Sequence, residues 1–298
     1  MTTEYPANEP VAIVGTGRIA CAIGRLLQLR GEPIAAVAGR SHDRSSRAAA
    51  FIGDKVRPAE CGDLPRLARR VIIAVPDSEI AGVAETLKSA GLRNGLALHT
   101  SGALGPNVLA PLRDTGVSCG VLHPMQSVAS AQEGVRQLTG ITYGLGGDPA
   151  ALAWSKQITQ LLDSRWLQIE DDRWGSYHSG AVLASNGLIA LVNISLRLFN
   201  AAGIESKEAL EAITPLIRTT LQNITQLGVE AALTGPVARG DIDTIALHLA
   251  AMADLPVGMV SFYQAVSLQI LAIARLRGLP ESHSRQLENL LTSHAGPA

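Results

Sequence analysis

Two patterns of hydrophobic positions follow one another along the chain. In the first part, short apolar runs typical of β-strands alternate with helical patterns. The runs lie at 11–14, 33–38, 70–75, 95–100 and 117–122, with two weaker ones around 141–145 and 166–169 and a helical pattern over about 149–162 between those two. Apolar strands separated by helices are typical of βαβ units, so this part predicts a parallel sheet buried on both faces.

From about residue 172 the strand pattern ends, and long helical patterns follow. They cover about 172–201, 205–227, 241–253, 257–276 and 281–292. The first and fourth contain long stretches without Asp, Glu, Lys or Arg, but residues such as Asn193 and Gln264 disfavour a helix in contact with lipid. Burial in a core or at a subunit interface is the better interpretation. We expect a sheet domain over 1–170, an all-helical domain over 171–298, and no membrane partner.

The first strand runs into a glycine turn, Gly15-Thr16-Gly17-Arg18-Ile19-Ala20, and a helical pattern follows at once. In the phosphate-binding turn of dinucleotide folds, Gly15 would allow the tight turn and Gly17 would let the backbone approach a pyrophosphate. Ala20 would let the helix pack closely on the strand, and the helix N-terminus would offer free N–H groups. The sequence thus predicts an α/β chain: an N-terminal Rossmann-type parallel-sheet domain followed by an all-helical C-terminal domain.

The end of the second strand bears on the choice of cofactor. An NAD site usually has Asp or Glu there, which binds the ribose 2′-hydroxyl. Here the strand ends in Gly39-Arg40-Ser41, and Arg40 can pair with a 2′-phosphate and stack on adenine. We therefore predict NADP as cofactor, with Val75 and Pro76 beside it at the end of another strand. The alternative is a solvated basic loop that caps the next helix.

Composition and charge exclude several classes of partner. The formal net charge is −1, the pI is near 6.7, and aromatic residues make up 3% of the chain. A chain with so little positive charge and so few aromatic rings is not expected to bind nucleic acid or an anionic membrane. The three cysteines show no paired or metal-type spacing and suit a reducing cytoplasm, and the seven histidines show no metal-binding motif.

Three places in the sequence are candidates for contact with a small-molecule substrate, and each also has a purely structural interpretation. Ser101 and Gly102 follow a strand and could bind a carboxylate, or could form an ordinary helix-capping turn. His123 ends the next strand and could contact substrate or fix its loop. Arg239 could clamp a carboxylate, or could form a salt bridge with Asp241 that shapes the loop.

At this point the chain resembles known families. Its glycine turn and Gly39-Arg40-Ser41 look like the NADP-binding half of pyrroline-5-carboxylate reductases, β-hydroxyacid dehydrogenases and coenzyme-F420-dependent NADP oxidoreductases. The closer resemblance is to Rossmann-like proteins with a DUF2520 domain. The segments that carry it are His99 to Ala103, Leu122 to Gln126, Tyr177 to Asn186, Leu233 to Asp241, His248-Leu249 and Tyr263 to Ala265. This resemblance implies an NADP-linked oxidoreductase whose helical domain forms a homodimer.

The chemistry of such a reductase needs a proton donor near the nicotinamide. In the β-hydroxyacid dehydrogenases that donor is a Lys, with an Asn one turn further along the same helix. No Lys lies between Trp174 and Asn193, and His178 is the nearest titratable residue. Ser185 returns to the face of His178 seven residues later, with Asn186 beside it, and both could orient a substrate. The alternative for His178 is a histidine that is hydrogen-bonded within the helical core.

The sequence therefore favours NADPH-dependent reduction of a small keto acid, such as a ketopantoate-like 2-oxo acid, or of an imino acid. His178 would donate the proton, with Asn186, Ser185, Ser101 and Arg239 positioning the substrate. One alternative is a non-catalytic NADP-binding sensor or assembly protein, which the missing Lys favours. Another is hydride exchange between NADP and an F420-type deazaflavin.

Overall fold

A computed structural model describes residues 9–293 and divides the chain into two compact units. The first unit ends at Leu188 and the second begins at Ile189. The strands end near residue 170, as the sequence predicts, because the last one stops at Gln168. Helix α7 (Trp174–Val182) nevertheless stays with the first unit, and its Trp174 is buried there with 2% of its surface exposed.

The first unit is built on one eight-stranded sheet. Its strands are β1 (Val11–Val14), β2 (Ile34–Ala38), β3 (Arg57–Ala59), β4 (Arg70–Ile73), β5 (Leu96–His99), β6 (Ser118–Pro124), β7 (Thr142–Gly147) and β8 (Arg165–Gln168). Their order is β3-β2-β1-β4-β5-β6-β7-β8, and all neighbours are parallel except β6 and β7. The strand order reverses between β1 and β4, and open α/β sheets bind ligands beyond the carboxyl ends of such strands.

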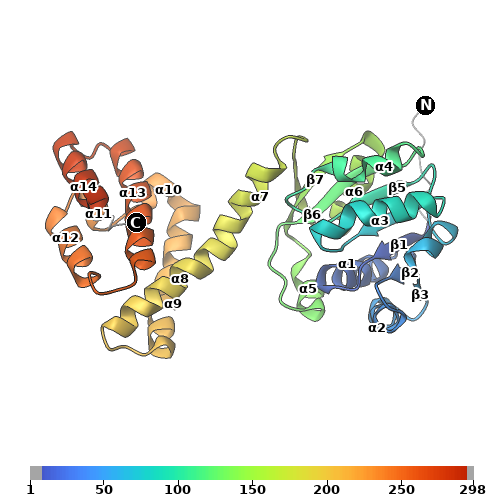
Figure 1. Ribbon diagram of the computed structural model, residues 1–298, viewed down its shortest axis with the longest axis horizontal. Helices are drawn as coiled ribbons and strands as arrows, with labels where there is room; N and C mark the ends of the chain where they lie inside the picture. The colour runs from blue at the N-terminus through green and yellow to red at the C-terminus, as the bar shows by residue number, and fades with distance from the viewer. Residues whose placement is uncertain (1–8, 294–298) are drawn as a thin grey trace. The chain divides into compact units, whose positions relative to one another are not determined.

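Helices cover both faces of this sheet (Figure 1). On one face lie α1 (Arg18–Leu29), α2 (His42–Ile52), α5 (Ala131–Gln137) and α6 (Pro149–Leu161). On the other lie α3 (Asp77–Ser89), α4 (Ala110–Arg113) and the 3₁₀ helices η1 (Cys61–Arg66) and η2 (Pro106–Leu109). The alternation is visible in β1, where Val11 and Ile13 join the first core and Ala12 and Val14 the second. This is the predicted α/β fold, with one antiparallel pair in the sheet.

The described residues of the second unit form helices joined by short loops, with no strand among them. It contains α8 (Leu188–Ala201), α9 (Ser206–Leu227), α10 (Val229–Ala232), α11 (Pro236–Arg239), α12 (Ile242–Ala251), α13 (Val257–Leu276) and α14 (Glu281–Ser293). Residues from α11, α12, α13 and α14, such as Val237, Leu249, Leu271 and Leu287, form its core. The long helices occur where the sequence predicts them, but a π-helical segment, Leu183–Gly187, interrupts the first. The short α10 and α11 were not predicted.

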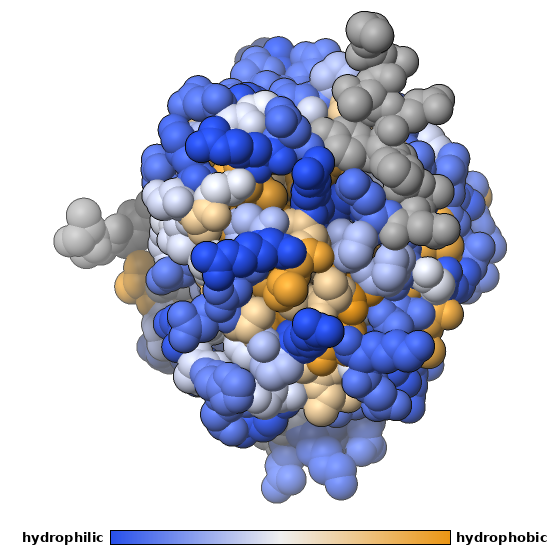
Figure 2. All heavy atoms as spheres, turned by 90° about the vertical axis from the view of Figure 1, so that its right-hand side faces the viewer, coloured by the Kyte–Doolittle hydropathy of each residue, from blue (hydrophilic) through white to orange (hydrophobic). Residues whose placement is uncertain are grey.

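Two helices among the described residues are long and apolar enough to cross a membrane, namely Trp174–Ala201 and Val257–Leu276. Within one copy, 0% of the apolar window of the first and 28% of that of the second is buried. Packing within either unit therefore does not bury the apolar window of the first helix. Leu183 and Ile189 on this helix are 72% and 68% exposed. By contrast, hydrophilic side chains predominate on the face of the molecule seen in Figure 2.

Candidate functional site

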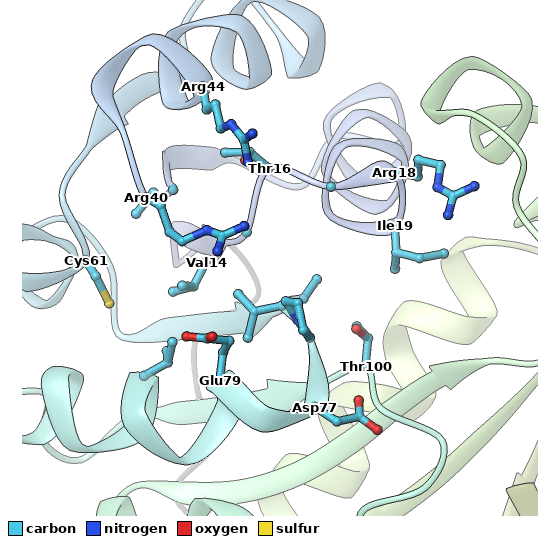
Figure 3. A pocket seen from close by; sticks show the side chains of 18 of the residues that line it. Val14, Thr16, Arg18, Ile19, Arg40, Arg44, Cys61, Asp77, Glu79 and Thr100 are labelled. Carbon is cyan, nitrogen blue, oxygen red and sulfur yellow. The ribbon is translucent and has the colours of Figure 1, made fainter.

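A cavity of about 570 Å³ opens in the first unit at the carboxyl ends of β1, β2 and β4 (Figure 3). Its lining combines backbone from the glycine turn with charged side chains from the loops and helices that follow the strands. The lining residues are Val14, Gly15, Thr16, Gly17, Arg18, Ile19, Ala38, Gly39, Arg40, Arg44, Cys61, Ala74, Val75, Pro76, Asp77, Glu79, Val83, Thr100 and Ser101. The cavity thus lies where the reversal of strand order predicts a ligand site.

The glycine turn brings backbone close to the cavity. Gly15 has a φ of +124°, and a Cβ on it would lie 2.1 Å from the carbonyl oxygen of Ala74, the residue that follows the neighbouring strand β4. A Cβ on Gly17 would meet nothing within 4 Å, so the backbone there faces open space. Helix α1 begins just after Gly17 with no side-chain cap and no acid in its first turn. Its free N–H groups and the open approach at Gly17 fit a pyrophosphate.

Basic side chains define one end of the cavity. Figure 3 shows Arg40 and Arg44 on one side and Glu79 on the other. The Oγ of Ser41 accepts a hydrogen bond from the N–H of Arg44 at 3.4 Å and so caps α2. For Ser41 this is the alternative interpretation, in which the loop caps the next helix. Ser41 is absent from the described lining, whereas Gly39 and Arg40 belong to it. Two guanidinium groups and no acid at the end of β2 fit a ribose 2′-phosphate.

The other end of the cavity is formed by the loops after β4 and β5. Val75 and Pro76 line it, together with Asp77, Thr100 and Ser101. The Oγ of Ser101 accepts hydrogen bonds from the N–H groups of Ala103 and Leu104, both at 3.2 Å. Ser101 therefore stabilises a turn, which is the structural alternative to a role in binding a carboxylate.

The predicted turn residues Arg18, Ile19 and Ala20 have different positions. Ile19 lines the cavity. The guanidinium of Arg18 donates a hydrogen bond to the carbonyl of Ala129 at 3.2 Å and points away from the centre of the pocket in Figure 3. Ala20 is buried, and a Cβ on Gly15 would lie 3.3 Å from the Cβ of Ala20. This is the close packing of helix on strand that the small side chain of Ala20 was predicted to allow.

Two histidines pack over Gly102, immediately after Ser101. A Cβ on Gly102 would lie 2.5 Å from Nε2 of His123 and 2.6 Å from Nδ1 of His178. The two rings stand edge to face, with their centroids 5.7 Å apart. The structure therefore brings together Gly102 from the loop after β5, His123 from β6 and His178 from α7. These three predicted residues form one cluster next to the end of the cavity.

Sequence reasoning missed Tyr177 as a member of this cluster. Its hydroxyl lies 2.8 Å from Nδ1 of His123, and its ring stacks edge to face on Trp174 at 5.5 Å. A Cβ on Gly144 of β7 would lie 2.4 Å from the Tyr177 hydroxyl, so the phenol end occupies the space that this glycine leaves. The only signal for Tyr177 in the sequence is its place in the segment that resembles the DUF2520 family.

Burial sets the protonation states of the cluster. It lowers the pKa of His123 to about 4, assisted by the nearby His178, while Asp77 opposes the shift. Burial also lowers the pKa of His99 to about 4, although its Nε2 lies 3.2 Å from the carbonyl of Gly105. The pKa of Tyr177 is raised by burial to about 12. At neutral pH His99 and His123 are uncharged imidazoles, and Tyr177 keeps its phenol proton.

Three predicted residues lie apart from this cluster. Ser185 and Asn186 are exposed, and the hydroxyl of Ser185 donates to the carbonyl of Ala181 at 2.9 Å. The π-helical segment changes the periodicity after His178, so seven residues no longer return to the same face. Arg239 belongs to the second unit, where its guanidinium lies 3.9 Å from the carboxylate of Asp241. This contact is the salt bridge that was the alternative to binding a substrate carboxylate. Among residues 9–293, no three His, Cys, Asp or Glu side chains are grouped to hold a metal.

Comparisons with known proteins agree with this architecture. The chain is 26% identical to protein TM1727 of Thermotoga maritima (TM-score 0.70, 90% of this chain and 99% of that one). For the putative NADP oxidoreductase BF3122 of Bacteroides fragilis the identity is 24% and the TM-score 0.69, over 88% and 98% of the chains. A reductive aminase of Aspergillus terreus in complex with NADPH and ethyl-5-oxohexanoate shares the fold at 14% identity (TM-score 0.62, 96% and 93%).

No curated protein sequence matches the chain significantly. Family models, however, match both of its parts. Residues 3–124 match the Rossmann-like domain, and residues 141–270 match DUF2520, a domain of unknown function. The resemblance noted in the sequence is thereby confirmed: the chain joins a Rossmann-like domain to a DUF2520 domain.

Proposed function

We propose that the chain is an NADPH-dependent reductase of a small substrate with a reducible C=O or C=N bond. The observation that carries the proposal is a single cavity that joins a glycine turn and two arginines to the loop bearing Ser101. The histidine cluster packs on the next residue, Gly102. The similarity to a reductive aminase in complex with NADPH supports this proposal at the level of fold.

Each part of the cavity has a role toward the cofactor. The N–H groups at the start of α1 hold the pyrophosphate, and Gly17 lets the backbone approach it. Arg40 and Arg44 hold the 2′-phosphate. Asp77, Thr100 and Ser101 lie at the opposite end of the cavity, where they would face the nicotinamide. NADPH, when bound, supplies the hydride.

The residues of the chain supply the proton and the positioning. His178 donates a proton to the heteroatom of the substrate, because imidazole is the side chain most often used for this step. The Nδ1 of His178 is buried and makes no hydrogen bond to the described residues, so it is available for this task. His123 and the loop that carries Ser101 and Gly102 position a keto acid or imino acid. The roles of Ser185, Asn186 and Arg239 stay predictions.

We further propose that two copies associate through the helical domain. Helix α9 carries Leu216, Leu221 and Leu227, each at least 60% exposed in one copy. The apolar helix Trp174–Ala201 is interrupted by polar residues, including Asn186 and Asn193, which favour a protein partner over lipid. Analytical ultracentrifugation tests this proposal. A dimer that Leu216→Glu converts to monomers supports it, and a monomeric wild-type protein contradicts it.

We propose that the protein works in a reducing cytoplasm. Cys21, Cys61 and Cys119 are free thiols.

Turnover with a substrate panel tests the reductase proposal. Purified protein is mixed with NADPH and small keto acids or cyclic imines, and cofactor oxidation is followed. Oxidation with one substrate class, lost in His178→Ala but retained in the exposed His283→Ala, supports the proposal, provided that NADPH affinity is unchanged. Cofactor binding without oxidation of NADPH indicates the sensor alternative. Oxidation only with an added deazaflavin indicates hydride exchange.

A further inference from the structure

His123 presents its two ring nitrogens to different surroundings. Nδ1 lies 2.8 Å from the Tyr177 hydroxyl, away from the site. Nε2 lies over Gly102, close to the point that Nδ1 of His178 also approaches. Only one of the two nitrogens carries a hydrogen in a neutral imidazole. The hydrogen bond at Nδ1 therefore decides whether Nε2 is a donor or an acceptor toward the site.

The Tyr177 hydroxyl carries one hydrogen, so it can donate one hydrogen bond. Its oxygen lies against the backbone of Gly144, whose hydrogen bond opposes the burial-driven rise in the pKa of this phenol. A phenol O–H is a stronger hydrogen-bond donor than the N–H of a neutral imidazole, and an imidazole nitrogen is a stronger acceptor than a phenol oxygen. At the 2.8 Å contact the phenol therefore donates its hydrogen to His123, which accepts it at Nδ1. The edge-to-face packing of Tyr177 on His123, with centroids 5.6 Å apart, holds this geometry.

We infer that Tyr177 is a positioning residue that fixes the hydrogen of His123 on Nε2, so that His123 is a permanent hydrogen-bond donor beside His178. The catalytic meaning of this arrangement rests on the proposed function. The Nε2–H group polarises the C=O or C=N bond by donating to its heteroatom, and His178 remains the source of the transferred proton. Tyr177 does not touch the substrate and acts only through His123.

The charged and titratable groups around His123 agree with a neutral donor. They are Tyr177 and His178 on α7, His99 on β5 and Asp77 on α3. Burial keeps the ring of His123 uncharged through the neutral range. A neutral ring has two tautomers, and in water they are close enough in energy for one hydrogen bond of about 1 kcal/mol to shift their ratio several-fold. The buried Tyr177 contact is such a bond.

Nitrogen NMR of the imidazole rings tests this inference without substrate or cofactor. Long-range ¹H–¹⁵N spectra distinguish the Nε2–H tautomer, the Nδ1–H tautomer and the charged ring, and His123→Gln identifies the signals of His123. The wild-type protein at about pH 7 is expected to show His123 as the Nε2–H tautomer. In Tyr177→Phe the ratio of tautomers should shift about fivefold toward a mixture.

Two further variants separate this role from general packing. Gly144→Ala places a methyl group 2.4 Å from the position of the Tyr177 oxygen, so it should displace the phenol and reproduce the change seen in Tyr177→Phe. Tyr143→Phe is the matched control, because its hydroxyl donates to the Leu138 carbonyl in the core and should leave the signals of His123 unchanged. An Nδ1–H tautomer in the wild type, or an unchanged ratio in Tyr177→Phe, would overturn the inference. Failure to reduce any substrate would count against the proposed function alone.

Discussion

The rings of His123 and His178 meet edge to face above Gly102, with their centroids 5.7 Å apart. One ring comes from the end of β6 and the other from the first turns of α7. The contact requires a residue without a side chain at position 102, since a Cβ there would lie within 2.6 Å of both rings. The neighbouring Ser101 lines the dinucleotide cavity. This relationship connects the proton-donating side of the proposed site to its cofactor side.

Replacing Gly102 by alanine should separate chemistry from cofactor binding. The methyl group would push both rings away, so turnover should fall at least tenfold while NADPH affinity stays unchanged. Overpacking of this kind also costs about 1–3 kcal/mol of stability. Kinetics, calorimetry and urea unfolding measure the three quantities. The control is Gly82→Ala, where a Cβ meets nothing within 4 Å. Full activity in Gly102→Ala would show that the rings do not need their present positions.

The two glycines of the phosphate turn should respond differently to alanine. Gly15→Ala forces a Cβ to within 2.1 Å of the Ala74 carbonyl at a φ of +124°, so it should lower the unfolding free energy by more than 2 kcal/mol, of the order seen for such backbone strain. Gly17→Ala meets no protein atom within 4 Å and should leave stability nearly unchanged. It should still weaken NADPH binding about tenfold or more, because the methyl group fills the approach to the pyrophosphate. Equal effects of both variants on stability would contradict this assignment.

The side chain at position 40 should control the choice between NADP and NAD. Arg40→Asp places a carboxylate where the 2′-phosphate is expected, so the preference for NADPH over NADH should fall by at least a hundredfold, or about 3 kcal/mol. Titration of each dinucleotide measures the change. Arg47→Ala is the matched control, because Arg47 pairs with Asp43 at 2.6 Å and does not line the cavity. An unchanged preference in Arg40→Asp would place the 2′-phosphate elsewhere.

Two buried histidines should make the protein less stable in mild acid. His99 and His123 have pKa values of about 4 when folded against 6.5 as the ordinary value. Between those values the unfolded chain binds more protons, so stability is fully present above about pH 6.5 and is lost as the pH falls toward 4. Each group contributes on the order of 3 kcal/mol to this loss. Urea unfolding at several pH values measures it, and His99→Asn should make the decline shallower over the same range. A stability that is constant from pH 7 to 5 would contradict the assignment.

The parts of the fold that the sequence predicted are those with a local pattern. The run from Val11 to Ala20 carries strand, turn and helix in contiguous residues, and the structure confirms all three. Strand β3 was missed because Arg57-Pro58-Ala59 is short and exposed. The antiparallel pairing of β7 with β6 was also missed, since an apolar run does not record the direction of its neighbour.

In the site, too, features with a local sequence pattern were predicted and features that depend on distant residues were not. Glycine positions and strand ends are visible in the sequence, so the sequence indicated Gly15, which lines the cavity, and Gly102 and His123, which the structure brings together. Tyr177 was missed because its partner, His123, is 54 positions away and becomes its neighbour only through the sheet. The expectation that Ser185 shares a face with His178 assumed an unbroken α-helix, which the π-helical segment Leu183–Gly187 interrupts.

Isothermal titration calorimetry of the purified protein with NADPH and NADH tests the central claim most directly. We expect one NADPH site per chain and affinity at least tenfold tighter than for NADH, because Arg40 and Arg44 line the cavity and could pair with the 2′-phosphate. No detectable uptake of NADPH, or tighter uptake of NADH, would contradict the account.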